Sequence, residues 1–310
     1  MTADVGKVGV LGGGPWGMSL ALAALRTGAR VILHSRRLEQ VSGVTVTAEL
    51  KELAEARLIL IAVPSKLARP IARDLGDHLT GAHILVHGIR GLSGDELLTV
   101  SEILQQETPV RRLGALGGPV QAGELAEGRP SAMVVGSAFV DVQDAVVQAL
   151  QGTWLQMHRT TDLVGLEWAS ALVGCLSIGV GYAQARRDVS PGLMAALISR
   201  AVDEAAGIAV AAGAQHSTLY GLGGYGDLLA SMALPNRPEV VVGRALAGGD
   251  TLEEARKEAK LRVEAVELLP RVVRFAERHG VGCAIFQALA EVVKGAADPE
   301  AIVRALFASR

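Results

Sequence analysis

Short runs of aliphatic residues alternate with amphipathic stretches over the first 160 residues of the chain. Runs bounded by glycine, proline or polar residues are typical of buried strands, and apolar positions recurring every three to four residues between them predict helices. The predicted strands cover residues 8–11, 30–34, 44–47, 58–63, 83–87, 113–116, 130–135 and 155–158. The predicted helices between them include residues 16–26, 48–56 and 140–150. This alternation predicts an α/β fold with a doubly wound parallel sheet.

The hydrophobic pattern changes near Thr161 and Asp162. Beyond this point apolar positions recur only with the period of a helix. The predicted helices cover residues 163–187, 192–212, 227–233, 240–246, 252–258, 263–278, 284–293 and 300–307. We therefore expect an α/β domain of residues 1–160 and an all-helical domain of residues 161–310, since a chain of 310 residues suits two cores.

A glycine-rich turn joins the first predicted strand to the first predicted helix. Gly12, Gly14 and Gly17 follow the G-x-G-x-x-G spacing, and Pro15 and Trp16 lie in the same turn. In dinucleotide-binding domains the first glycine permits the tight turn, the second admits the pyrophosphate, and the third lets the helix pack on the strand. The helix N-terminus presents unpaired N–H groups to the phosphates. The pattern favours a cofactor site over a bare structural turn.

The second predicted strand ends in Ser35, Arg36 and Arg37 instead of an acidic residue. A carboxylate there would bind the ribose 2′-hydroxyl of NAD, whereas arginines accommodate the 2′-phosphate of NADP. Solvated surface arginines are the alternative interpretation, and arginine can also stack on adenine without distinguishing the two cofactors. We expect NADP as the cofactor, with NAD as the alternative.

Composition narrows the class of protein further. The chain is 50% hydrophobic and 3% aromatic, which indicates an aliphatic core, and its formal net charge of −2 offers no basic surface for nucleic acid. Two cysteines, Cys175 and Cys283, imply no disulfide framework. The sequence shows no apparent secretory signal and no apolar span of 18 residues. The histidines at 34, 83 and 87 lack metal-ligand spacing. We expect a soluble cytoplasmic protein without a metal, a nucleic-acid partner or a membrane span.

Several spaced motifs resemble those of bacterial-type NAD(P)-dependent glycerol-3-phosphate dehydrogenases, in the same order and over nearly the whole chain. They are Gly12–Gly17, Val63-Pro64-Ser65, Arg90-Gly91-Leu92, Gly118-Pro119 with Glu124, Asp162 with Gly165-Leu166-Glu167, Thr218–Leu228, Asn236-Arg237 and Gly243. The resemblance implies a Rossmann domain followed by a helical substrate domain. It implies hydride transfer between a nicotinamide and sn-glycerol 3-phosphate, dihydroxyacetone phosphate or a related small carbonyl compound in the interdomain cleft. A homodimer is left open.

The same resemblance implies roles for single residues. Val63, Pro64 and Glu264 match positions expected to contact the cofactor, although Ala265 replaces the glycine that the family has after this glutamate. The side chains expected to meet the substrate are Arg90, Asp227, Ser231, Asn236 and Arg237.

Two departures from the family pattern bear on the chemistry. Val173 stands where the family has the lysine expected to exchange a proton with the substrate oxygen, and Pro235 stands where it has a phosphate-binding arginine. Arg90 replaces a lysine and keeps the charge but cannot act as a neutral base. The catalytic candidates are then Asp227, Arg90 and Tyr182, whose phenol can donate a proton. The alternative functions are an imine or other carbonyl reductase that lacks the lysine, and a catalytically silent NADP(H)-binding sensor.

Overall fold

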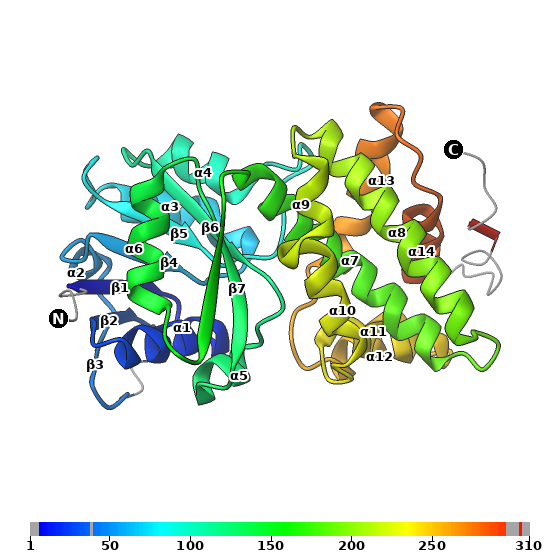
Figure 1. The fold of residues 1–310 in the computed structure, drawn as a ribbon, viewed down its shortest axis with the longest axis horizontal. Coiled ribbons are helices and arrows are strands. Elements are labelled where there is room, and N and C mark those ends of the chain that lie inside the picture. The colour runs from blue at the N-terminus through cyan, green and yellow to red at the C-terminus, as the bar shows by residue number, and fades with distance from the viewer. Residues whose placement is uncertain (1–5, 38–39, 296–303, 306–310) are drawn as a thin grey trace. The chain divides into compact units, whose positions relative to one another are not determined.

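The computed structural model describes residues 6–37, 40–295 and 304–305. The chain forms two compact units (Figure 1). The first unit comprises Met1–Ile89 and Leu98–Leu163, and the second comprises Arg90–Leu97 and Val164–Arg310. The main division falls after residue 163, and a short segment inside the α/β part of the sequence belongs to the second unit. The helix expected at residues 300–307 lies, apart from residues 304 and 305, outside the described residues.

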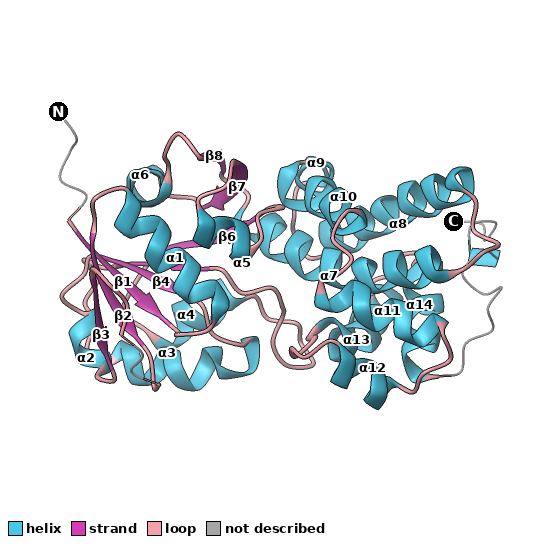
Figure 2. Ribbon diagram, turned by 90° about the horizontal axis from the view of Figure 1, so that it is seen from below, coloured by secondary structure: helices cyan, strands magenta, loops and turns pink. Residues whose placement is uncertain are grey.

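The first unit is built on a single eight-stranded sheet, drawn in magenta in Figure 2. Its strands are β1 (Lys7–Leu11), β2 (Arg30–His34), β3 (Val44–Thr47), β4 (Leu58–Ile61), β5 (Ile84–His87), β6 (Arg112–Gly117), β7 (Ser131–Gly136) and β8 (Leu155–Thr160). Their order across the sheet is β3-β2-β1-β4-β5-β6-β7-β8. The chain winds outward from β1 in one direction and then from β4 in the other, so the carboxyl ends of β1 and β4 lie at a topological switch point.

Helices cover both faces of this sheet. They are α1 (Pro15–Arg26), α2 (Leu50–Leu53), α3 (Ala68–Gly76), α4 (Val100–Glu107), α5 (Ala122–Glu127) and α6 (Val140–Leu150), with a 3₁₀ turn η1 at Ser65–Leu67. Side chains alternate along β4, where Leu60 joins one apolar cluster with α1 and α6, and Ile59 joins another with α3 and α4. The doubly wound α/β prediction is confirmed. The helix expected at residues 48–56 is shorter than predicted.

The sheet departs from the all-parallel prediction at one strand pair. β6 and β7 run antiparallel, with Ala115 opposite Gly136. The only helix in their connection is the six-residue α5, which spans about 9 Å. A strand of six residues is about 20 Å long, so this helix is too short to carry the chain back across the sheet. The chain therefore re-enters the sheet from the edge at which β6 ended.

The described part of the second unit is helical, as predicted (Figure 2). Its elements are α7 (Leu163–Ala185), α8 (Pro191–Ala211), α9 (His216–Tyr220), the π-helix η2 (Leu222–Gly226), α10 (Asp227–Met232), α11 (Pro238–Ala247), α12 (Leu252–Glu258), α13 (Ala265–Arg278) and α14 (Ala284–Lys294). The sequence pattern missed α9 and η2. It also missed that α7 is long and apolar enough, by length and composition, to cross a membrane. Because 83% of that apolar stretch is buried within the structure, α7 reads as a core helix.

Two glycines bring α7 and α11 into close contact. A Cβ atom at Gly181 would lie 2.0 Å from the carbonyl oxygen of Val240, and one at Gly243 would lie 1.9 Å from that of Ile178. Both positions therefore need glycine. The close packing fixes the start of α11 beside α7, which matters for the side chain just before it, Arg237.

A buried glutamate links α8 to α14. The Oε2 atom of Glu204 accepts a hydrogen bond from the Ile285 N–H at 2.8 Å, and Oε1 lies 3.5 Å from the Arg200 guanidinium. Burial raises the pKa of Glu204, although backbone hydrogen bonds from the start of α14 and the charge of Arg200 oppose the rise. The folded protein therefore holds this proton to a higher pH than the unfolded chain does.

This raised pKa predicts how stability depends on pH. As pH rises, the unfolded chain loses the Glu204 proton first, at about pH 4.3, the ordinary pKa of glutamate. The folded protein still holds the proton at that pH. Relative to Glu204→Gln, the free energy of unfolding of the wild type should fall as pH rises from there through the folded pKa, and then level off. Urea unfolding from pH 4 to pH 7 measures this difference. Glu253→Gln is the control, because Glu253 is an exposed glutamate whose ion-pair partner is Lys257. A difference that stays constant over this range contradicts the prediction.

Candidate functional site

The glycine-rich turn is held against the carboxyl ends of two strands. Gly12 has a φ of +118°, and a Cβ atom there would lie 2.3 Å from the carbonyl oxygen of Ala62, just beyond β4. A Cβ atom at Gly17 would lie 1.8 Å from the carbonyl oxygen of Gly12. Gly12 therefore makes the turn, and Gly17 lets α1 sit on it, as the spacing predicts. Val63 flanks the turn, its Cγ1 atom 3.3 Å from the Gly12 Cβ position.

Gly14 faces open space. It is the N-cap of α1, its φ is −77°, and no atom lies within 4 Å of a Cβ built on it. Pro15 is the first residue of the helix, and the first turn carries no acidic side chain. The α1 N-terminus therefore offers backbone N–H groups and a positive partial charge without a competing carboxylate, which fits a pyrophosphate.

The end of β2 lies beside this turn. A Cβ atom at Gly13 would lie 2.2 Å from the Ser35 Oγ, so the two backbones approach closely. Ser35 is buried and its Oγ accepts a hydrogen bond from the Arg37 N–H at 3.3 Å. Arg36 and Arg37 are exposed. Two cationic side chains thus follow the strand end at which an adenine ribose is bound in dinucleotide domains.

Trp16 packs behind the turn. Its Nε1 atom would lie 2.2 Å from a Cβ at Gly88, which follows β5. The indole N–H is buried and has no hydrogen-bond partner among the residues that the structure describes. The glycine loop, Ser35, Val63 and the residue after β5 therefore share the carboxyl edge of the sheet, as an open α/β fold requires for a ligand site.

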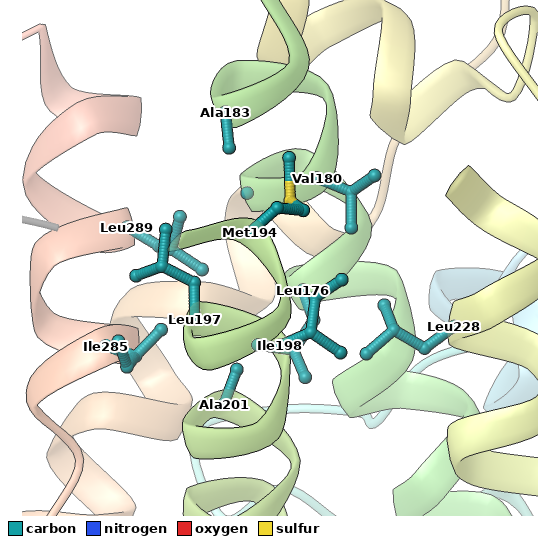
Figure 3. Close-up of a pocket in the computed structure, with 11 residues that line it drawn as sticks. Leu176, Val180, Ala183, Met194, Leu197, Ile198, Ala201, Leu228, Ile285 and Leu289 are labelled. Carbon is teal, nitrogen blue, oxygen red and sulfur yellow. The ribbon is translucent and has the colours of Figure 1, made fainter. Parts of the chain in front are cut away.

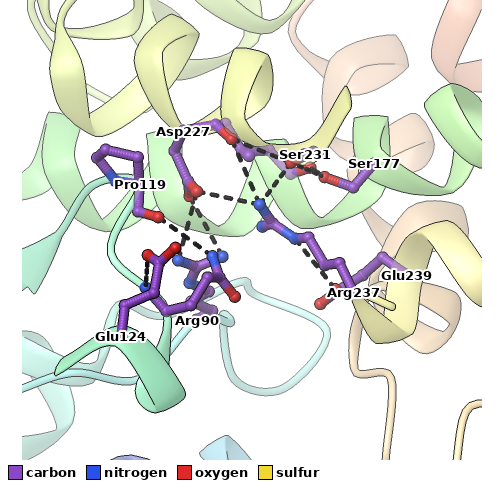
Figure 4. A network of polar contacts seen from close by, with 10 residues as sticks. Arg90, Pro119, Glu124, Ser177, Asp227, Ser231, Arg237 and Glu239 are labelled. Atoms are coloured by element: carbon purple, nitrogen blue, oxygen red, sulfur yellow. Dashed lines mark hydrogen bonds and ion pairs between the residues drawn. The ribbon is translucent and has the colours of Figure 1, made fainter. Parts of the chain in front are cut away.

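A second cluster of polar side chains lies in the second unit and is shown in Figure 4. Asp227, the first residue of α10, is fully buried between two arginines. Arg90 Nη2 and Nη1 lie 3.4 and 3.3 Å from Asp227 Oδ1 and Oδ2. Arg237 Nη1 donates to Oδ1 at 3.0 Å. The structure thus brings together three of the residues that the sequence predicted, from segments 137 and 10 residues apart from Asp227.

Hydroxyl groups extend this cluster to α7. Ser231 is buried, and its Oγ accepts from Arg237 Nη1 and donates to the Asp227 carbonyl oxygen at 3.0 Å. The hydroxyl of Ser177 lies 3.0 Å from that of Ser231 and donates to the Val173 carbonyl oxygen at 2.7 Å. The turn of α7 that carries Val173 is therefore tied to the helix that carries Asp227.

Local backbone geometry sets the positions of these side chains. The π-helix η2 leads directly into α10, and a Cβ atom at its Gly224 would lie 2.2 Å from the Leu219 carbonyl oxygen. Such π-turns are frequent at functional sites. Arg237 is the N-cap of α11, and Pro238 at the next position restricts it to extended backbone. Both Asp227 and Arg237 therefore stand at the starts of helices.

The surroundings shift the pKa of each arginine in the cluster. Burial lowers the pKa of Arg237, but the charges of Asp227 and Glu239, with hydrogen bonds to both, outweigh this and raise it. Burial lowers the pKa of Arg90, partly offset by the charge of Asp227. Guanidinium groups remain protonated through such shifts, so neither arginine supplies a proton near neutral pH.

Four further predicted residues are placed by the fold as follows. Tyr182 is buried on α7, nine residues and about 13.5 Å beyond Val173, with the Arg186 guanidinium 6.0 Å from its ring centre. Asn236 is exposed. Glu264 is the N-cap of α13 in the second unit. Pro64, also exposed, follows the end of β4 in the first unit.

Two residues of the cluster were not predicted from the sequence. Glu239 accepts a hydrogen bond from Arg237 Nε at 3.2 Å, and Ser177 reaches Ser231. A glutamate in the first turn of a helix is expected to interact with the helix dipole, so the sequence does not point to Arg237 as its partner. A serine within an apolar helix does not indicate which residue it will contact. Only the fold shows these two roles.

An apolar cavity of about 30 Å³ lies within the second unit (Figure 3). Its lining comes from α7, α8, α10 and α14 and includes Leu176, Met194, Leu197, Leu228 and Leu289. It has no polar side chain and room for little more than water, so we read it as a packing defect and not as a substrate site. No group of three or more His, Cys, Asp or Glu side chains suited to a metal occurs within the described ranges.

Comparisons with known proteins place these features in a family. Residues 42–143 match the model of the NAD-dependent glycerol-3-phosphate dehydrogenase N-terminus, and residues 162–304 match that of its C-terminus. The glycerol-3-phosphate dehydrogenase [NAD(P)+] of Parvibaculum lavamentivorans is 30% identical, covering 99% of this chain and 98% of that protein. The Maricaulis maris protein of the same name is 28% identical over 97% and 96%.

Solved structures share the fold. The glycerol-3-phosphate dehydrogenase of Coxiella burnetii superposes with a TM-score of 0.88 at 22% identity, covering 98% of this chain and 99% of that one. A ketopantoate reductase family protein from Ralstonia eutropha superposes with a TM-score of 0.59 at 17% identity, over 93% and 97% of the two chains. Proteins named for different substrates therefore share this fold.

Proposed function

Because the chain belongs to the NAD-dependent glycerol-3-phosphate dehydrogenase family, we propose that it is an NADP(H)-dependent oxidoreductase. Its substrate pair is sn-glycerol 3-phosphate and dihydroxyacetone phosphate, or a related small carbonyl compound. The observation that supports this most is the glycine turn, which keeps every feature that a pyrophosphate needs: the positive φ of Gly12, open space at Gly14 and close packing at Gly17.

The first unit supplies the residues that would hold the cofactor. Backbone N–H groups at the start of α1 bind the pyrophosphate, and Arg36 and Arg37 bind the 2′-phosphate. Bound NADPH supplies a hydride from the nicotinamide to the carbonyl carbon. The proposed cofactor contacts from this unit are Gly12, Gly14, Pro15, Trp16, Gly17, Ser35, Arg36, Arg37, Val63 and Pro64. The resemblance adds Glu264, which belongs to the second unit.

The second unit supplies the residues that would hold the substrate. Arg90, Arg237 and the exposed Asn236 donate hydrogen bonds to its oxygens, and Asp227 and Ser231 orient the two arginines. Of the catalytic candidates, Arg90 and Asp227 lie in this cluster, whereas Tyr182 lies about two and a half turns of α7 from Val173. We therefore place Arg90 and Asp227 ahead of Tyr182.

Turnover and binding measured side by side test the proposal. Calorimetry measures NADPH affinity, and absorbance at the nicotinamide band measures reduction of dihydroxyacetone phosphate. Binding accompanied by turnover supports the proposed reaction. Binding without turnover on ketone phosphates or cyclic imines favours the silent sensor, and turnover on cyclic imines alone favours the imine reductase. Val173, buried at the family's lysine position, is the observation that keeps these two alternatives in the test.

Cofactor preference gives a separate prediction. Changing Arg36 and Arg37 together to Ala should weaken NADPH binding about tenfold to a hundredfold and leave NADH binding nearly unchanged, since a charge-assisted hydrogen bond contributes roughly 1.5–3 kcal/mol. Titration of both cofactors by calorimetry measures the effect. Arg30→Ala, an exposed arginine at the opposite end of β2, is the matched control. Equal affinity for both cofactors before and after the change would refute the 2′-phosphate argument.

The cytoplasm is the proposed compartment. Both cysteines are free and buried, and burial raises the pKa of the Cys283 thiol to about 11, so that it stays protonated and unreactive. Unpaired buried thiols are typical of proteins in reducing compartments.

A further inference from the structure

We propose that Arg271 on α13 is a positioning residue for the polar cluster around Asp227. It holds the backbone of the segment Arg90–Leu97 and thereby keeps the Arg90 guanidinium beside Asp227. Both the segment and α13 belong to the second unit. The proposal rests on the proposed function, because it matters to the chemistry only if Arg90 meets the substrate. Arg271 acts through the segment and not on the ligand.

The contacts between Arg90 and Asp227 are long. Nη2 and Nη1 of Arg90 lie 3.4 and 3.3 Å from the two carboxylate oxygens, whereas charge-assisted N–H to carboxylate bonds usually measure about 2.7–2.9 Å. The Arg90 side chain is also 31% exposed, so water competes for its donors. Asp227 alone therefore holds this guanidinium loosely, and its place depends on the backbone that carries it.

That backbone ends in a strained turn. The Leu97 N–H donates to the Gly94 carbonyl oxygen at 3.4 Å, and Leu97 and Gly94 have φ angles of +55° and +69°. Glycine adopts this left-handed conformation readily, whereas in leucine it is strained. The side chains of Leu97 and Leu92 are buried in the core of the second unit. Strain of this kind persists only where neighbouring contacts hold the backbone, so such contacts are expected on the turn.

Arg271 supplies a contact of this kind. Its Nη1 atom donates to the Gly94 carbonyl oxygen at 3.4 Å, and this is the same oxygen that accepts the Leu97 N–H. Its Nε atom lies 3.7 Å from Asp95 Oδ1, and its side chain is 33% exposed. One guanidinium thus meets a backbone oxygen and a carboxylate oxygen of adjacent residues, which ties the turn to α13.

A neighbouring arginine provides a comparison. Arg274, nearly one turn further along α13, reaches the Asp95 carboxylate, with Nη2 3.6 Å from Oδ1. Arg274 and Asp95 are 57% and 82% exposed, and ion pairs between such exposed groups contribute little. Arg271, which also binds the backbone, is therefore expected to have the larger effect.

Hydrogen exchange of the full chain, read by mass spectrometry, tests the positioning without a ligand. Arg271→Gln should speed exchange at residues 91–97 about tenfold, because a bond that holds the turn is lost. Arg274→Gln should change it less than about twofold. Arg278→Gln, which removes an exposed arginine from the last turn of the same helix, is the matched control and should leave exchange unchanged. Peptides from β1 and β4 should exchange alike in all variants, which shows that the fold is kept.

Calorimetry on the NADPH-loaded chain, with sn-glycerol 3-phosphate as the probe, tests whether the held segment matters to the site. Arg271→Gln should weaken probe binding about fivefold. Arg271→Lys, which keeps a donor for Gly94, should weaken it less. In an Arg90→Gln background the further change at 271 should alter affinity less than about 1.5-fold, because two residues that act through one contact are not additive. A merely structural role would weaken binding equally in both backgrounds.

Unchanged exchange at residues 91–97 in a folded Arg271→Gln protein overturns the proposal. An equal loss of affinity with and without Arg90 also overturns it. Where the probe does not bind at all, in wild type or in Arg90→Gln, the exchange result alone decides: faster exchange at residues 91–97 supports the proposal and unchanged exchange refutes it. A wild-type protein that binds NADPH but not the probe refutes the proposed substrate and not the positioning of the segment.

Discussion

Gly14→Val is expected to weaken NADPH binding at least about a hundredfold while the protein stays folded. The structure supports both halves of this expectation. Gly14 has an ordinary φ of −77° and no neighbour within 4 Å of its Cβ position, so a side chain fits the folded chain without strain. The same open space lies at the N-terminus of α1, where the pyrophosphate is bound in dinucleotide domains. A valine there would occupy the ligand's place.

Calorimetry and quenching of tryptophan fluorescence measure the loss of binding, and thermal unfolding measures the fold. Gly282→Val is the matched control, because that glycine also has an open Cβ position and belongs to the second unit, not to the glycine-rich turn. Undiminished NADPH affinity in a folded Gly14→Val protein would show that the dinucleotide is bound elsewhere.

The second large effect concerns the buried valine on α7. We expect the unmodified protein to reduce dihydroxyacetone phosphate at least about a hundredfold more slowly than a variant in which a lysine at 173 supplies the proton, since a positioned acid contributes about two to four decades in rate. Val173 is 2% exposed, and Ser177 and Ser231 connect its turn to Asp227. A lysine there would project from the turn of α7 tied to the cluster.

The informative variant combines Val173→Lys, Gly174→Asn and Pro235→Arg. A Cβ atom at the buried Gly174 meets only Ala265 at 3.6 Å, an ordinary contact, and Pro235 is exposed, so neither change begins with a backbone clash. The lysine is the demanding change. Burial lowers its pKa, and Asp227 already faces Arg90 and Arg237, so its carboxylate is shared among three cations.

Steady-state turnover of the combined variant and of each single variant measures the effect. The lysine at 173 would restore proton donation, and the arginine at 235 would restore phosphate binding. Turnover that appears only in the combined variant therefore supports a site that kept its shape but lost both of these groups. Brisk reduction of dihydroxyacetone phosphate by the unmodified protein would contradict the prediction. Another group, with Asp227 or Tyr182 the first candidates, would then be the acid.

Local patterns predicted those parts of the fold that depend on nearby residues. The positions of Gly12, Gly14 and Gly17 report directly on a backbone turn, and the runs around Leu58–Ile61 report burial on both faces of a strand. Such features need only a few neighbours along the chain, and the structure agrees with them. The long helices of the second unit are predictable for the same reason.

Features that depend on distant segments were not predictable. The direction of β7 depends on how far α5 can carry the chain. The orientation of Arg237 depends on Glu239 as well as on Asp227, and nothing in the spacing of these residues shows it. α7 carries an apolar stretch of membrane-spanning length, and only its packing among the other helices identifies it as a core helix.

The short segment Arg90–Leu97 has a consequence for any attempt to dissect the protein. The chain passes from one unit to the other after residues 89, 97 and 163, so the second unit is not a continuous stretch. A fragment that begins at residue 164 loses Leu92 and Leu97, which are 4% and 2% exposed in its core, and it loses one guanidinium partner of Asp227. Burial of two leucines contributes roughly 3–6 kcal/mol, a large share of the roughly 5–15 kcal/mol by which a domain is stable. The second unit should therefore be recovered as a folded fragment only when this segment is supplied with it, as a peptide or through a linker. Gene fusions or domain exchanges that cut once near residue 163 should yield insoluble protein.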